Sequence, residues 1–104
     1  MKKSPCEPQL PSEFQLGGLQ WSVKEVTDLQ KNANAYGLTH AETCEIMIDA
    51  DIKNNDVRMI TFYHELFHAL FQAQGRDDLS QNEQLVDTSA SLLWQMLKTS
   101  KWSQ

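Results

Sequence analysis

The chain lacks several features that would place it in large classes of protein. No apolar run approaches the length of a membrane span, so we expect no membrane contact. Cysteine is limited to Cys6 and Cys44, too few for a disulfide framework. No hydrophobic signal region follows residues 1–5. We therefore expect a protein of the reducing cytoplasm.

A basic surface is also missing. Nine Lys and Arg residues stand against 14 Asp and Glu residues, which gives a formal net charge of −5. The only adjacent basic pair is Lys2-Lys3. Nucleic-acid-binding domains concentrate positive charge on one face, so we expect no direct contact with nucleic acid.

The residues that are present suit one small globular domain. The 104 residues are 40% hydrophobic and 22% charged, which is ordinary for a folded domain. All three prolines, Pro5, Pro8 and Pro11, fall in the first dozen residues. We expect a flexible N-terminal arm over residues 1–13 and a single domain over residues 14–104.

The first half of the chain shows the period-two pattern of strands. Between residues 14 and 24, Leu19, Trp21 and Val23 share one face, and Gly17-Gly18 before them suits a turn. Residues 31–37 read as a loop, and residues 43–49 as another strand, with Ile46 and Ile48 on one face. These segments predict a small antiparallel sheet.

The second half shows the helical period. Asn54 offers an N-cap side chain and Gly75 a C-terminal stop, and the helix between them is apolar on both faces, which is typical of a central, buried helix. Another helix is expected over residues 81–98. The predicted fold class is therefore α+β: a small antiparallel sheet packed on two helices.

The central helix carries the motif His64-Glu-Leu-Phe-His68. Positions i and i+4 point the same way, so both imidazoles can bind one cation, and Zn²⁺ is the usual occupant. Glu65 lies about 60° from His68 around the helix, beside the metal, where it can take a proton from a bound water. We expect one Zn²⁺ per chain.

The alternative is a pair of core histidines bonded to backbone or carboxylate partners. We expect both rings to be buried, because Ile60, Phe67 and Phe71 lie around them. Two buried imidazoles one turn apart need partners or a metal, and the motif favours the metal.

A catalytic zinc site needs a third protein ligand. Glu83 and Asp87 lie one turn apart in the apolar stripe of the second helix, where we expect burial to be costly without a cation. Glu83 is then the ligand and Asp87 the acceptor that fixes the tautomer of a ligand histidine. Two alternatives stay open: Ser80 to Glu83 forms a capping box, or Asp87 is itself the ligand. Asp77 and Asp78 are more remote candidates.

These motifs resemble those of the gluzincin metallopeptidases. His64-Glu65-x-x-His68 followed by Glu83-x-x-x-Asp87 looks like their pattern, in which two His and a Glu bind zinc, the motif Glu is general base and the Asp orients a ligand His. The resemblance covers roughly residues 18–97. The chain looks like minimal phage-type members near the ImmA/IrrE and SprT-like groups, also in two short segments: Ala35-Tyr-Gly-Leu-Thr-His40 and Ile46-Met-Ile-Asp49.

The resemblance implies a zincin-like metalloendopeptidase that hydrolyses peptide bonds of a protein or peptide substrate. Tyr36 and His40 are candidate oxyanion or substrate contacts, although a surface loop histidine is the simpler interpretation of His40. Residues 44–49 can bind an extended peptide by edge pairing, or form an ordinary strand of the sheet.

Two other functions compete with this interpretation. One is a non-catalytic zinc module for regulation or interaction; Glu65 favours the enzyme, because a structural zinc site does not need a general base. The other is a DNA-repair protease of SprT-like type, which the acidic balance disfavours. The sequence predicts no particular oligomeric state.

Overall fold

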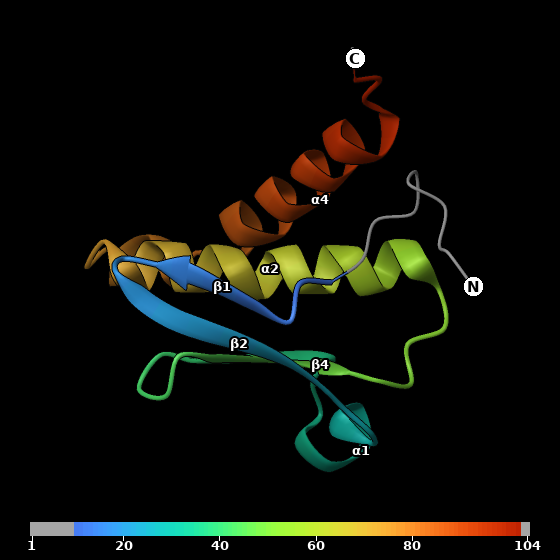
Figure 1. The fold of residues 1–104 in the computed structure, drawn as a ribbon, viewed down its shortest axis with the longest axis horizontal. Helices are drawn as coiled ribbons and strands as arrows, with labels where there is room; N and C mark the ends of the chain where they lie inside the picture. The colour runs from blue at the N-terminus through green and yellow to red at the C-terminus, as the bar shows by residue number, and fades with distance from the viewer. Residues whose placement is uncertain (1–9, 103–104) are drawn as a thin grey trace.

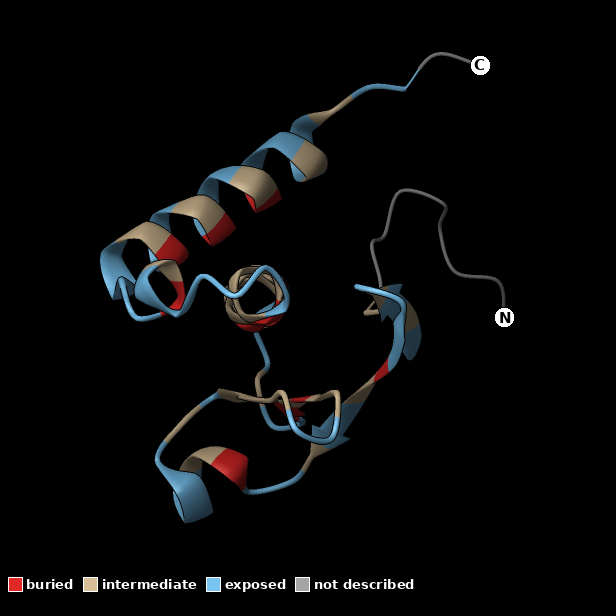
Figure 2. Ribbon diagram, turned by 90° about the vertical axis from the view of Figure 1, so that its left-hand side faces the viewer, coloured by how far each residue is buried: buried red, intermediate tan, exposed pale blue. Residues whose placement is uncertain are grey.

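The computed structural model describes residues 10–102, which fold into three layers. In Figure 1, α2 runs along the sheet, and α4 rises diagonally from α2 on the side away from the sheet. Figure 2 looks along α2 and shows this helix between the sheet and α4. No helix among these residues is long and apolar enough to cross a membrane. The strands are β1 (Glu13–Leu16), β2 (Leu19–Val26), β3 (Gly37–His40) and β4 (Glu45–Asp49), and the helices are α1 (Leu29–Ala33), α2 (Asn55–Ala73), α3 (Asp77–Ser80) and α4 (Glu83–Thr99).

The first period-two segment folds as a hairpin. β1 and β2 pair antiparallel, with Leu16 opposite Leu19. Gly17 and Gly18 between them have φ values of 60° and 79°, which glycine adopts without steric cost. The predicted turn at Gly17-Gly18 is confirmed.

The sheet is mixed, so the prediction of an antiparallel sheet is wrong. Its strand order is β1-β2-β4-β3, with β2 and β4 parallel and the other two pairs antiparallel. Between β2 and β4 the chain forms α1 and then β3, which enters the sheet as its edge strand. The chain then reverses, and β4 runs in the same direction as β2. Part of the predicted loop over residues 31–37 is thus the end of α1.

β4 is an inner strand, and this overturns its suggested role in edge pairing. β2 lies on one side of β4 and β3 on the other, so its backbone groups are used within the sheet. The edge on this side of the sheet is β3, a strand that the sequence did not predict.

The ends of α2 agree with the sequence. The Asn54 side chain accepts a hydrogen bond from the Val57 amide at 3.1 Å, which caps the helix. At the other end Gly75 has a φ of 70°, and the Arg76 amide donates to the Phe71 carbonyl at 2.8 Å. This is the bonding of a Schellman C-cap.

α2 buries apolar side chains against both neighbouring layers. Toward the sheet, Phe62 and Ala69 pack in one cluster with Trp21, Ile46 and Ile48. Burying a side chain the size of Phe62 or Ile46 stabilises the fold by about 1.5–3 kcal/mol. Toward α4, the ring of Tyr63 stacks on that of Trp94 at 6.2 Å between centroids. The buried residues of α4 are Val86, Ala90 and Trp94.

The N-terminal arm predicted over residues 1–13 lies mostly outside the described residues. Within them, Leu10 packs against the core cluster and β1 begins at Glu13. The boundary between arm and domain stays a prediction.

A polar contact ties the start of α2 to the end of α4. The Asp56 carboxylate accepts hydrogen bonds from Trp94 Nε1 and Lys98 Nζ, both at 2.9 Å. The ammonium group of Lys98 and, to a smaller extent, the indole of Trp94 lower the pKa of Asp56 below its usual value.

This lowered pKa predicts how stability depends on pH. Ionised Asp56 stabilises the folded state above its unfolded pKa of about 3.9, and this contribution disappears as pH falls through the lower folded pKa. Asp56→Asn should therefore lower Tm at pH 7, and the gap to wild type should narrow toward pH 3. Thermal melts across this range, with exposed Asp77→Asn as matched control, measure it. A gap independent of pH would contradict the assignment.

Candidate metal centre

Three side chains from α2 and α4 converge on one point. His64 Nε2 and His68 Nε2 lie 3.2 Å apart. The Glu83 carboxylate approaches both, with Oε2 3.3 Å from His64 Nε2 and Oε1 3.2 Å from His68 Nε2. The structure thus brings together the two motif histidines and the predicted third ligand.

These spacings fit a tetrahedral zinc ion. Ligand atoms bound to Zn²⁺ at about 2.0–2.2 Å in tetrahedral geometry lie roughly 3.3–3.6 Å from one another. The three observed separations, 3.2 to 3.3 Å, lie close to the short end of this range. Two imidazoles and one carboxylate are also a donor set that zinc accepts, with the fourth position left open.

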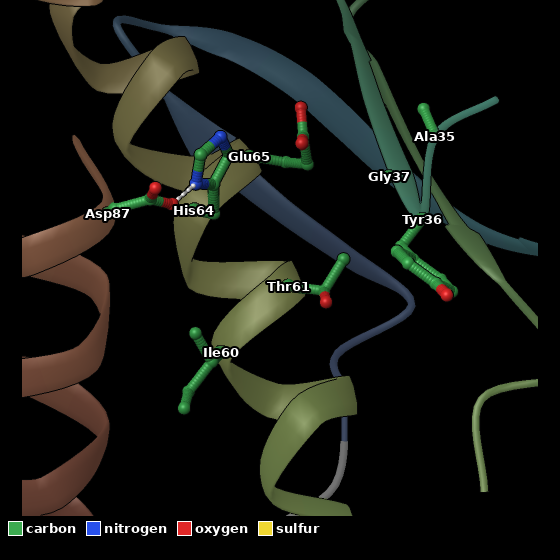
Figure 3. A pocket seen from close by; sticks show the side chains of 8 residues that line it. All are labelled: Ala35, Tyr36, Gly37, Ile60, Thr61, His64, Glu65 and Asp87. Atoms are coloured by element: carbon green, nitrogen blue, oxygen red, sulfur yellow. Dashed lines mark ion pairs between the residues drawn. The ribbon is translucent and has the colours of Figure 1, made fainter. Parts of the chain in front are cut away.

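The far side of each imidazole also has a partner. His64 Nδ1 lies 2.6 Å from Asp87 Oδ1, and a dashed line in Figure 3 marks this ion pair. His68 Nδ1 lies 3.0 Å from Ser80 Oγ. An ionised carboxylate only accepts hydrogen bonds, so His64 Nδ1 carries the hydrogen and its Nε2 presents a lone pair. Gln72 Nε2 donates to the same Ser80 oxygen at 3.2 Å and holds it in place.

The cluster therefore needs a hydrogen atom or a cation between its atoms. A lone pair on His64 Nε2 faces a second imidazole nitrogen and a carboxylate, all within about one hydrogen-bond length. Either a proton on one Nε2 or a cation bound by all three groups relieves this repulsion. The separations of 3.2 to 3.3 Å are compatible with either arrangement.

The capping-box alternative for Glu83 does not occur. The side chain of Asn82 caps α4 by accepting from the Leu85 amide at 3.1 Å. The Ser80 amide donates instead to the Arg76 carbonyl at 3.1 Å. The carboxylate of Glu83 is therefore available to the histidines.

The expectation that the site is buried is wrong. The side chains of Glu83 and Asp87 are 64% and 69% exposed, because α4 turns Val86, Ala90 and Trp94 inward and these acids lie at the rim. The two imidazoles are only partly buried. The interpretation of Glu83 as the third candidate ligand thus depends on its distances to both histidines and not on the cost of burying its carboxylate.

The other acidic candidates lie apart from this cluster. Asp77 and Asp78 are exposed residues of α3, and Asp78 forms an ion pair with Arg76 at 2.9 Å. Neither belongs to the group of residues able to hold a metal ion.

Glu65 faces the sheet rather than α4. In Figure 3 its carboxylate points toward β3, on the other side of α2 from Asp87. It is 7% exposed, and Thr39 Oγ1 donates to its Oε1 at 2.7 Å. Burial raises the pKa of Glu65, while the hydrogen bond from Thr39 acts in the opposite direction.

A pocket of about 280 Å³ opens beside His64 and Glu65. Figure 3 shows it between α2, α4 and the start of β3. Tyr36, one of the predicted substrate contacts, lines this pocket but is 54% exposed, and its ring points away from His64. The full lining is Ala35, Tyr36, Gly37, Ile60, Thr61, His64, Glu65 and Asp87.

His40 is not a surface loop histidine. It is the last residue of β3, paired with Glu45, and its Nε2 is buried without a hydrogen-bond partner among residues 10–102. It does not line the pocket, so the structure does not bring it to the site.

Sequence reasoning missed three residues that contact the motif. The sequence indicates Ser80 only as a cap, and it gives Gly37 and Thr39 no role beyond their place in the segment of residues 35–40. Gly37 and Thr39 are two residues apart in a strand, and this spacing indicates only weakly that they share a face. Nothing near Ser80 in the sequence indicates that it contacts His68.

Comparison of this chain with protein-family models, with curated proteins and with solved structures found no match. The interpretation of the site therefore depends on its own geometry.

The geometry predicts one zinc ion per chain. Zinc at a hundred times its Kd should raise the free energy of unfolding by about 2.7 kcal/mol. His64→Ala or His68→Ala should abolish that rise and lose the bound metal, whereas both variants should differ much less from wild type in chelator. His40→Ala, the matched control, should keep both. Elemental analysis and thermal melts test this, and a wild type without a zinc-dependent shift would refute it.

The roles of the two acids predict a ranking of affinities. Asp87→Ala should weaken zinc binding by roughly 10- to 100-fold, the usual effect of losing a partner of a ligand histidine. Glu83→Ala should weaken it more, because it removes a donor atom. Competition with a chromophoric chelator measures both, with the exposed neighbour Gln84→Ala as control. The opposite ranking would make Asp87 the ligand.

Proposed function

We propose that this chain is a minimal zincin-like metalloendopeptidase, in which His64, His68 and Glu83 hold one zinc ion and Glu65 is the general base. The observation that carries the proposal is the convergence of the three donor groups at tetrahedral spacing. Asp87 would fix the tautomer of His64, and Ser80 would orient the ring of His68.

Zinc bound by these groups would supply a Lewis acid and would lower the pKa of a water molecule at the open position. The chain itself would supply the proton transfers. Glu65 would accept a proton from the water that attacks the peptide carbonyl carbon, and would then deliver it to the leaving amine nitrogen as the C–N bond breaks. Its raised pKa suits a group that must both take and release a proton.

The substrate would lie between β3 and the pocket. β3 is bonded to β4 on one side only, so its outer edge can pair with an extended peptide. The pocket beside His64 and Glu65 is large enough for one substrate side chain, with an apolar wall from Ala35 and Ile60. A domain of this size has no room for a deep cleft, which favours cleavage of unfolded or loop segments.

The role of Glu65 predicts a separation of binding from turnover. Glu65→Gln should keep the fold and the zinc affinity, yet lower the cleavage rate by about 10²- to 10⁴-fold, the usual contribution of a general base. The measurement compares zinc-loaded wild type and variant on a broad peptide library. Glu42→Gln, an exposed glutamate before β4, is the matched control and should cleave like wild type.

Two results would overturn the proposal that the chain is a peptidase. Identical cleavage patterns from wild type and Glu65→Gln would show that any observed hydrolysis comes from a contaminant. Zinc binding without cleavage would leave a non-catalytic zinc module as the better account.

A further inference from the structure

We propose that Thr39 is a positioning residue for Glu65, and that Gly37 makes the room for this contact. The inference rests on the proposed function, because it assigns Thr39 to the orientation of the general base. It starts from two contacts of one hydroxyl: Thr39 Oγ1 lies 2.7 Å from Glu65 Oε1 and 3.0 Å from the Glu65 carbonyl oxygen.

Gly37 lets β3 approach α2 closely enough for these contacts. A Cβ built on Gly37 would lie 2.8 Å from Glu65 Cγ and 2.9 Å from Thr61 Cγ2, closer than real Cβ atoms come. Gly37 does not have a positive φ, so this close approach accounts for the glycine. Residues 37 and 39 share one face of the strand, and both therefore face α2.

The strand itself is firmly held. Gly37 pairs with Ile48 and Thr39 with Ile46, and both isoleucines are 0% exposed. The hydroxyl of Thr39 is thus attached to the packed core rather than to a surface loop. A general base needs such support, because a misplacement of about 1 Å can cost 10²-fold in rate.

The contact with Thr39 gives the two carboxylate oxygens of Glu65 different surroundings. Oε1 is bonded to Thr39, whereas Oε2 has no hydrogen-bond partner in the described part of the chain. Oε2 lies 3.1 Å from the position that a Cβ on Gly37 would occupy, and both Glu65 and Gly37 line the pocket. One oxygen is anchored and the other is left to exchange protons.

The first test separates positioning from folding. Thr39→Val keeps the shape and removes the hydroxyl, and it should lower kcat by about 10-fold or more while KM and zinc stoichiometry stay within about two-fold of wild type. Thr39→Ser should recover most of kcat. Thr43→Val is the matched control: Thr43 also donates to a glutamate, Glu45 at 3.1 Å, but away from the site. Wild-type kcat in folded, zinc-loaded Thr39→Val would overturn the proposal.

The second test needs no catalysis. In metal-free protein, Thr39→Val should lower Tm by about 4 °C or more, as expected for one lost hydrogen bond in a domain of this size. In a Glu65→Ala background the same change should lower Tm less, by the share that the carboxylate contributes, because the contact of the hydroxyl with the backbone carbonyl of residue 65 remains. Equal losses in both backgrounds would overturn the link. If wild type cleaves nothing, the peptidase proposal fails, while this cycle still reports on the Thr39–Glu65 contact.

Discussion

The fold depends on one constraint: α2 must bury apolar side chains on two opposite faces. Phe62 and Ala69 require a sheet below the helix, and Tyr63 requires the aromatic ring of Trp94 above it. Only the flanks of α2 between these two contacts stay accessible. His64 and His68 lie on the flank next to α4, whereas Glu65 is buried against β3 and reaches only the wall of the pocket. The packing of the helix therefore decides where chemistry is possible.

Features with a local physical cause were predictable from the sequence. Asn54 and Gly75 mark the two ends of α2, where the capping hydrogen bonds join residues only a few positions apart. His64 and His68 lie on the same side of α2 because they are four residues apart. The mixed sheet was not predictable in this way. Whether β2 and β4 run parallel depends on the path of the chain between them, and β3 is too short to show a period.

The contacts around the motif arise only when distant segments meet. Thr39 is 26 residues from Glu65, and Ser80 is 12 residues from His68. No local sequence pattern therefore indicates either hydrogen bond. The pairing of Glu83 with the histidines was predicted, but for a wrong reason, since its side chain is exposed. Distances between atoms, and not burial, are what distinguish a ligand from a cap at this position.

His64 and Glu65 are neighbours in sequence but depend on different parts of the molecule. The imidazoles are oriented by Asp87 and Ser80 from the C-terminal helices, whereas the carboxylate is oriented by Thr39 from the sheet. Substitutions in β3 can therefore alter the proposed base without disturbing the proposed metal ligands. In evolutionary terms the two halves of the proposed site are modular: under the proposed function, a descendant can lose hydrolysis through one strand and still retain the three donor groups for a new role.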